Sequence, residues 1–176
     1  MACWSSSWLG EWLATTYTNY LLGKVVLSIS DPPGSPATQS YSSNISHIYL
    51  TYTSVEIHTA GVVNTSNVGW HRIVRAQTID LLTVLNVQQT LGSTRLSPGK
   101  YDQIRMFTNT TTVTINGTNY SYNIPSSKIQ VIITGGGFQI TVGQTVKALL
   151  TISFNDSEIM TYGPNLSPEA RADVLS

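Results

Sequence analysis

The sequence predicts an all-β fold, a two-sheet immunoglobulin-like sandwich, and three observations support that prediction. β-branched and aromatic residues, including nine tyrosines, are abundant, and helix-forming residues are sparse outside the two ends of the chain. Roughly nine short segments with strand-like alternation are separated by Gly, Pro and Asn turn signals. At 176 residues, the chain is long enough to bury one core in a single domain.

The first 21 residues differ from the rest and are predicted to be an N-terminal arm. Trp4, Trp8 and Trp12 recur every four residues. This spacing fits one face of a helix, and it equally fits the inward positions of a strand, because all three numbers are even. Polar residues over 14–20 favour the extended form, and an amphipathic helix remains the alternative. Three tryptophans are too much apolar surface to leave in water, so we expect another surface to cover them.

Residues 22–176 are predicted to form the sandwich domain. In its first half, alternating apolar residues bounded by turn signals predict four strands, at 23–30, 44–60, 69–74 and 78–85. The segment 44–60 is so long that we expect a bulge or bend within it. Residues 86–95 carry no clear pattern and are left unassigned.

The stretch 96–107 is the one around which the remaining strands are predicted to be arranged. Its Ser-Pro-Gly sequence predicts a turn, since proline presets φ and glycine tolerates a positive φ. The strand that follows, 100–107, has no purely apolar face. We therefore expect it near a sheet edge or rim, with Tyr101 and Arg105 hydrogen-bonded.

The second half of the domain contains the clearest local signal. Asn116-Gly117 lies between two alternating segments, which is typical of a two-residue hairpin turn. Three further strands are predicted at 128–134, 138–142 and 146–154, with the triple glycine at 135–137 as a hairpin turn. Near the C-terminus, Ser167-Pro168-Glu169 has the pattern of a capped helix start, which predicts a short helix over 168–175.

The chain carries few charged residues, and this excludes partners that bind through a basic surface. The formal net charge is zero, only 10% of residues are charged, and Ser and Thr supply 44 of the 176 residues. A nucleic acid or an anionic membrane surface would need a basic face, so we expect neither as a partner. With only nine carboxylates, few native interactions can be lost on protonation, which predicts tolerance of acid.

The ionisable side chains indicate no enzyme, cofactor or metal site. The three histidines show no metal-ligand spacing, the triple glycine lacks the lysine of a phosphate loop, and no serine lies in a nucleophile elbow. Asp156 and Glu158 lie together, either as a solvated surface pair or as calcium ligands. Glu56 and Lys24 fall within predicted strands. Their side chains could form a salt bridge, a buried ion pair or an autocatalytic crosslink, and the sequence does not decide among these.

The single cysteine, Cys3, excludes an intramolecular disulfide, so the domain must rely on its core. A lipid anchor on Cys3 would need a signal upstream of this numbering, because no apolar segment precedes it. No run reaches the ~18 apolar residues of a membrane span. Either the protein is not exported, or its signal has already been removed.

Seven Asn-x-Ser/Thr triplets without a middle proline indicate an exported protein that carries N-linked glycans. They begin at Asn44, Asn64, Asn109, Asn116, Asn119, Asn155 and Asn165. Most of them lie at predicted turns or strand ends. Two are awkward, because Asn116 lies in the tight hairpin and Asn165 is followed at position 168 by proline.

Six short motifs occur in a fixed order: Gly23 to Pro33, V-E-I-H at 55–58, Gly69-Trp70, D-L-L at 80–82, P-G-x-Y-x-x-I-R at 98–105 and P-S-S-K at 125–128. In order and spacing they resemble a family of secreted bacterial and archaeal surface proteins and lipoproteins, classed only as a domain of unknown function. The resemblance covers residues 23–155. It implies a β-sandwich on the cell surface and implies no activity.

The Trp-rich arm and the paucity of charge make the chain resemble, more narrowly, the glycosylated thread pilins of thermoacidophilic archaea. In such threads, an N-terminal extension of one subunit fills a groove in the next. The resemblance implies an extracellular homopolymer that serves adhesion or biofilm cohesion. A donated strand would cover an open sheet edge, and a head-to-tail contact that does not close builds a fibre.

The donor-strand hypothesis assigns roles to the even-numbered residues of the arm. Trp4, Trp8 and Trp12 would face inward into the neighbouring subunit, while the small residues Gly10 and Ala14 would fit shallow positions. The alternative function is a monomeric cell-surface module that binds carbohydrate or another surface.

Overall fold

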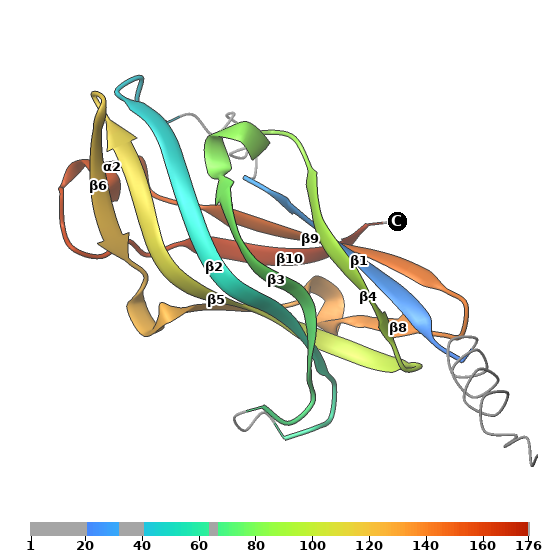
Figure 1. The fold of residues 1–176 in the computed structure, drawn as a ribbon. Coiled ribbons are helices and arrows are strands. Elements are labelled where there is room, and N and C mark those ends of the chain that lie inside the picture. Colours follow the sequence, from blue (N-terminus) through green and yellow to red (C-terminus); the bar gives the residue numbers. More distant parts are fainter. Residues whose placement is uncertain (1–20, 32–40, 64–66, 176) are drawn as a thin grey trace, which may run out of the picture.

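The computed structural model describes residues 21–31, 41–63 and 67–175, which form a sandwich of two β-sheets (Figure 1). The predicted all-β sandwich is therefore confirmed. The donor-strand residues of the arm and the sequon at Asn64 lie outside the described residues.

The described residues contain ten strands, β1 (Gly23–Ser30), β2 (Ile45–Thr59), β3 (Trp70–Asp80), β4 (Gln89–Leu96), β5 (Gly99–Ile115), β6 (Thr118–Asn123), β7 (Lys128–Ile132), β8 (Phe138–Ile140), β9 (Thr145–Ser153) and β10 (Glu169–Leu175). Their helical segments are short, namely η1 (Leu81–Val84), η2 (Pro125–Ser127), η3 (Thr134–Gly136) and α2 (Asp156–Met160). No helix among the described residues is long and apolar enough to cross a membrane.

The strands form a four-stranded and a six-stranded sheet. The first has the order β10-β9-β1-β4, and β1 in it runs parallel to β9 and antiparallel to β4. The second follows the path β3-β2-β5-β6, with β7 and β8 also paired to β5. Figure 1 shows the long strands β2 and β5 lying across β9 and β10 of the other layer.

The core lies between the two sheets and follows the two-residue period of the strands. In β1, Val25, Leu27 and Ile29 are fully buried, whereas the residues between them are partly exposed. In β2, Ile48 and Leu50 are likewise fully buried. Burial of each such side chain contributes roughly 1.5–3 kcal/mol, so the alternation seen in the sequence supplies the main favourable term of folding.

The strand β5 is central, so its predicted place near a sheet edge is wrong. It pairs with β2 along one side and with β8, β7 and β6 in succession along the other. Its polar residues find partners across the neighbouring strands. The Tyr101 hydroxyl donates to the Ser97 carbonyl (2.9 Å), and Arg105 donates to Glu56. The predicted hydrogen bonding of Tyr101 and Arg105 is confirmed.

Two predicted features near β3 and β7 are also wrong. The segment 78–85 is not a separate strand, because its first three residues end β3 and the Asp80 carboxylate accepts the Leu82 N–H (3.2 Å) to begin η1. The triple glycine does not join a hairpin, since β7 and β8 both pair with β5 and lie one after the other along it. A side chain at Gly137 would collide with the Tyr101 carbonyl, which explains the glycine there.

The predicted C-terminal helix over 168–175 is wrong, because this segment is the edge strand β10. It pairs antiparallel with β9, and Ala172 lies opposite Leu150, both of them buried. Pairing with an existing sheet outweighs the capping signal of a short helix. The unassigned segment 86–95 contains most of β4, and the helix α2 was not predicted.

Three sequence predictions are confirmed in detail. Residues 23–30 form β1 as predicted. The long strand β2 has register shifts against β5 between Leu50 and Tyr52 and again beyond Tyr52. Asn116 and Gly117 form the two-residue turn between β5 and β6, with φ of 50° and 76°.

Candidate assembly and modification sites

The six sequon asparagines within the described residues all have exposed side chains. They are Asn44, Asn109, Asn116, Asn119, Asn155 and Asn165. An N-linked glycan is bulky and hydrophilic and needs a surface position. Asn116 in the tight turn and Asn165, three residues before Pro168, are also exposed.

Three of these sequons gather at one end of the sandwich, the hairpin end, formed by the β5–β6 turn, the start of β2 and α2. The Asn116 N–H donates to the Asn44 carbonyl (2.8 Å). The Ser42 N–H donates to Asp156 (3.0 Å), the residue after Asn155. Figure 1 shows the β5–β6 turn and the start of β2 side by side at the upper left.

Two sequon side chains are held by hydrogen bonds through their oxygen atoms. The Thr114 hydroxyl donates to Asn119 Oδ1 (2.7 Å), and the Ser157 N–H donates to Asn155 Oδ1 (2.8 Å), which caps α2. An N-linked sugar is attached to the amide nitrogen of asparagine. These two bonds therefore orient the carboxamides without using the atom that would be modified.

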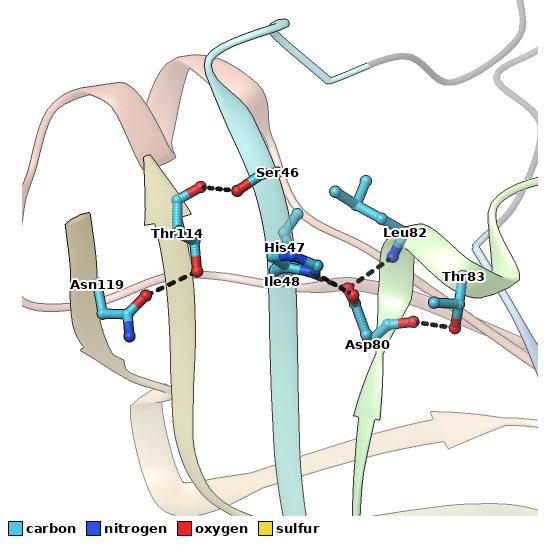
Figure 2. Close-up of polar contacts among 8 residues, drawn as sticks. All are labelled: Ser46, His47, Ile48, Asp80, Leu82, Thr83, Thr114 and Asn119. Carbon is cyan, nitrogen blue, oxygen red and sulfur yellow. Dashed lines mark hydrogen bonds and ion pairs between the residues drawn. The ribbon is translucent and has the colours of Figure 1, made fainter. Parts of the chain in front are cut away.

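Asp80 ties β2, β3 and η1 together on the outward face of the six-stranded sheet (Figure 2). One carboxylate oxygen lies 2.7 Å from His47 Nδ1, and the other accepts the Ile48 N–H (3.0 Å) and the Leu82 N–H (3.2 Å). The side chain of Asp80 is 11% exposed and that of His47 is 46% exposed. The carboxylate therefore fixes an exposed imidazole ring in one orientation.

The His47 ring also stacks on Tyr49, with centroids 5.1 Å apart and an angle of 11° between the ring planes. The two residues are separated by the buried Ile48, so both point to the outward face of β2. They form an aromatic pair, which we call the His47–Tyr49 platform.

Arg105 is the centre of a second cluster, where its guanidinium lies between two aromatic rings. The guanidinium carbon is 4.0 Å from the Trp70 ring centroid and 4.8 Å from that of Phe107. Its Nε and Nη2 both donate to Glu56 Oε2, at 2.8 and 2.6 Å. The predicted proximity of Glu56 to Lys24 does not occur, because Lys24 lies in the other sheet beside Arg95 and Thr145.

A third polar pair, His58 and Asp102, lies close to this cluster. The His58 Nδ1 atom is 2.9 Å from Asp102 Oδ1, and the His58 side chain is 2% exposed. Its ring lies 4.8 Å from that of Trp70. Both His–Asp pairs were missed from the sequence, because each joins residues on different strands that are 33 or 44 positions apart.

The acidic pair Asp156 and Glu158 holds chain segments rather than lying free in solvent. Asp156 accepts the Ser42 N–H, and both oxygens of Glu158 are within 3.2 Å of the Ser167 N–H. Among the described residues, no group of three or more His, Cys, Asp or Glu side chains could hold a metal ion.

Asp31 is a fully buried carboxyl at the end of β1. The Tyr41 hydroxyl donates a 2.6 Å hydrogen bond to Asp31 Oδ2 and accepts the Phe154 N–H (3.2 Å). Burial raises the pKa of Asp31 from 3.8 to about 6, and the bond from Tyr41 partly opposes the shift. Burial also raises the pKa of Tyr52 to about 12.

A groove of about 300 Å³ separates the outer edge of β7 from the start of β10. We call it the edge groove; its lining residues are Ile124, Pro125, Lys128, Ile129, Gln130, Val131, Ser167, Pro168 and Ala170. Backbone bridges close it at each end, between Asn123 and Asn165 and between Ile133 and Ala172. On the same edge Ile132 is 72% exposed. The groove is thus a short slot where the edges of the two sheets diverge.

Comparison with known proteins identifies a family for this chain. Residues 22–166 match the family described as a domain of unknown function (DUF4382). No curated protein and no solved structure matches the chain significantly. Since the match spans more than half of the 176 residues, the chain belongs to this family of domains of unknown function, DUF4382.

Proposed function

We propose that this protein is the structural subunit of an extracellular filament, in which the N-terminal arm of one copy binds the edge groove of the next. The edge groove is the observation that carries the proposal. It lies on the outer side of β7, which pairs with β5 on its inner side. A strand added there would extend the six-stranded sheet and cover its edge.

The size of the edge groove matches the spacing of the tryptophans in the arm. The five residues of β7 span about 16 Å at ~3.3 Å per residue, and the four-residue step from Trp4 to Trp8 spans about 13 Å. Two tryptophan side chains therefore fit along the groove. Ile129, Val131 and Ala170 supply apolar contacts for them.

The energy available from the arm is large enough to join subunits. The two tryptophans that the groove can take, at on the order of 200 Å² each and ~25 cal/mol per Å², give roughly 10 kcal/mol before the cost of ordering the arm. A contact between an arm and a groove is head-to-tail and does not close on itself, so it propagates into a fibre.

The exposure of the six described sequons supports an extracellular setting, because it leaves them open to N-glycosylation. A surface with so few charges needs another protection against lateral aggregation, and hydrophilic sugars provide it. We expect the native protein to be heavier than its 19.2 kDa polypeptide, which intact-mass measurement checks. A native mass equal to that of the bare chain would remove this support.

Filament formation is tested by negative-stain microscopy of purified protein and of a variant that lacks residues 1–14. The full chain should form fibres, whereas the truncated chain should stay monomeric, keep its fold and bind a synthetic peptide of residues 1–16. Loss of the monomer's fold without peptide binding would instead indicate that the arm is a helix packed on its own domain.

The edge groove is tested by a matched pair of substitutions on β10. Ala170→Trp fills the groove, while Val174→Trp adds the same ring at an exposed position of the same strand that does not line the groove. We expect Ala170→Trp to abolish fibres and peptide binding, and Val174→Trp to retain both. Equal polymerisation of the two variants would contradict the assignment of the groove.

The alternative function, a monomeric module that binds carbohydrate, is favoured by one observation, the partly exposed His47–Tyr49 platform. Under this alternative, purified full-length protein remains monodisperse at the mass of one subunit, and oligosaccharide binding is lost in Tyr49→Ala. Fibres formed by the full chain would exclude it as the main role.

A further inference from the structure

We propose that the glycan of Asn119 folds back over its own sheet and stacks its sugar rings on the His47–Tyr49 platform. The inference rests on the proposed glycosylation of the sequons and adds a binding site for a pyranose ring to it. The platform is then the binding site of a carbohydrate that is attached to the same chain.

The platform and Asn119 lie on the same face of three neighbouring strands. Asn119 on β6 is the cross-strand partner of Thr114 on β5, and Thr114 is the partner of His47 on β2. The side chains of Asn119 and His47 are exposed and that of Thr114 is half-buried, whereas the adjacent Val113 is fully buried. The row Asn119–Thr114–His47 therefore crosses the outward face of the sheet.

A parallel row one step further along the strands contains the second ring of the platform. Ser121 on β6 lies opposite Thr112 on β5, which lies opposite Tyr49 on β2. Neighbouring strands are about 4.8 Å apart, so β6 and β2 are separated by roughly 10 Å with only threonines between them on this face. Threonine side chains are short, and the first rings of an N-linked glycan can cross them.

The carboxamide of Asn119 is oriented for this path. Its oxygen is held by the Thr114 hydroxyl at 2.7 Å, and Figure 2 shows the side chain of Asn119 reaching toward β5. Glycosylation forms a bond between Nδ2 and the anomeric carbon of an oligosaccharide carried on a phosphate-activated donor. The carbon–oxygen bond to that phosphate breaks, the phosphate leaves with the electron pair, and Nδ2 loses one proton.

The platform has the properties that a sugar ring requires. Because the two rings are stacked, each covers one face of the other, and a sugar would lie on an outer face of the pair. Aromatic faces carry negative partial charge, which attracts the C–H bonds on the apolar face of a pyranose. The His47 ring is already fixed by Asp80 at 2.7 Å and by its stacking on Tyr49. A receptor fixed in this way loses little conformational freedom on contact, so most of the interaction is retained.

Substitution of Ser121 tests the inference without touching Asn119. Ser121→Ala destroys the sequon, and the matched Ser121→Thr keeps it. Both variants are made in a host that attaches the native glycan and in one without N-glycosylation, and glycopeptide mass spectrometry records occupancy of Asn119. In the glycosylated background, Ser121→Ala should melt about 2–4 °C below Ser121→Thr, and the unglycosylated pair should melt together.

Tyr49→Ala identifies the contact. It should lower the melting temperature of the glycosylated protein, and adding Ser121→Ala should cause no further loss. Ser157→Ala, which removes the sequon at Asn155, the N-cap of α2, should instead act additively with Tyr49→Ala. In NMR spectra, sugar protons should show cross-peaks to the rings of His47 and Tyr49.

Three outcomes would overturn the inference. They are an unmodified Asn119 in native protein, an occupied Asn119 with additive effects and no cross-peaks to the rings, and tight binding of a free oligosaccharide to the platform of fully glycosylated protein. None of them bears on fibre formation by the arm, so failure here is distinguishable from failure of the proposed function.

Discussion

Tyr41 and Asp31 are joined by a 2.6 Å hydrogen bond between the hydroxyl and one oxygen of a fully buried carboxyl group. The bond links the end of β1 to the segment that leads into β2. Because Tyr41 also accepts the Phe154 N–H, one oxygen atom ties this segment to the ends of both β1 and β9 in the four-stranded sheet. The protonation state of Asp31 is therefore coupled to the packing of the sandwich.

The first prediction concerns pH. The pKa of Asp31 is about 6 in the folded chain, above its ordinary value of 3.8, so folding favours the protonated form. Its contribution to stability is fully present below about pH 4 and is lost as the pH rises through 6. We expect the melting temperature to increase from pH 7 to pH 4, with at most about 3 kcal/mol from this group.

Asp31→Asn isolates this contribution. An amide does not titrate, so the variant should lose the pH dependence that Asp31 produces, and at pH 7 it should be at least as stable as the parent chain. Calorimetry at pH 4, 5, 6 and 7 measures both proteins. Parallel curves for the two would show that Asp31 has no role in the pH dependence.

The second prediction concerns Arg105. Arg105→Lys removes the two donors to Glu56 Oε2 and the planar group between Trp70 and Phe107, which a lysine ammonium cannot replace. Because both charged groups are largely buried, we expect a loss of about 2–4 kcal/mol in the free energy of unfolding. Arg75→Lys, at an exposed position of β3, is the control and should change it by less than about 0.5 kcal/mol. Urea denaturation distinguishes the two.

The third prediction concerns the β5–β6 turn. Gly117 has a φ of 76°, a left-handed conformation that costs a residue with a Cβ about 1–2 kcal/mol. Gly117→Ala should destabilise the domain by that amount, although nothing lies within 4 Å of the added methyl group. Gly163→Ala, with ordinary contacts and no positive φ, should be nearly neutral. Equal stability of the two variants in thermal denaturation would show that the turn tolerates another conformation.

The fourth prediction concerns Asp156. Its carboxylate accepts the Ser42 N–H, so Asp156→Ala should cost about 1–2 kcal/mol, and calcium or a chelator should leave the melting temperature unchanged. Asp173, in an exposed ion pair with Arg171, provides the matched control, and Asp173→Ala should cost less than about 1 kcal/mol. A calcium-dependent rise in melting temperature that Asp156→Ala abolishes would restore the calcium hypothesis.

Local patterns in the sequence were sufficient for features that local physics determines. The alternation of Val25, Leu27 and Ile29 predicts β1, and Asn116-Gly117 predicts its turn, because each depends on residues close together in the chain. The C-terminal strand β10 was not predictable in this way. Its Ser-Pro-Glu start favours a helix locally, and only the presence of β9 makes a strand more stable.

The candidate sites show the same limit. Asn-x-Ser/Thr triplets are visible in the sequence, so all the sequons could be predicted. The partners of His47 and Arg105 could not be predicted. Asp80 and Glu56 lie on other strands, and only the register of the sheet brings them next to His47 and Arg105. The central position of β5 was missed for this reason, since Arg105 looks unsuited to a sheet interior until Glu56 and the two aromatic rings surround it.

The position of β1 determines how the molecule responds to mechanical load. β1 follows directly on Leu22 and is bonded on both sides, to β4 over Gly23–Ile29 and to β9 over Lys24–Ser30. A pull on the chain at Leu22 along the strand loads both ladders in shear, because their hydrogen bonds run across the direction of force. The hydrogen bonds of both ladders must therefore break together rather than one after another. β1, the first strand to bear this force, is held by its neighbours along its whole length.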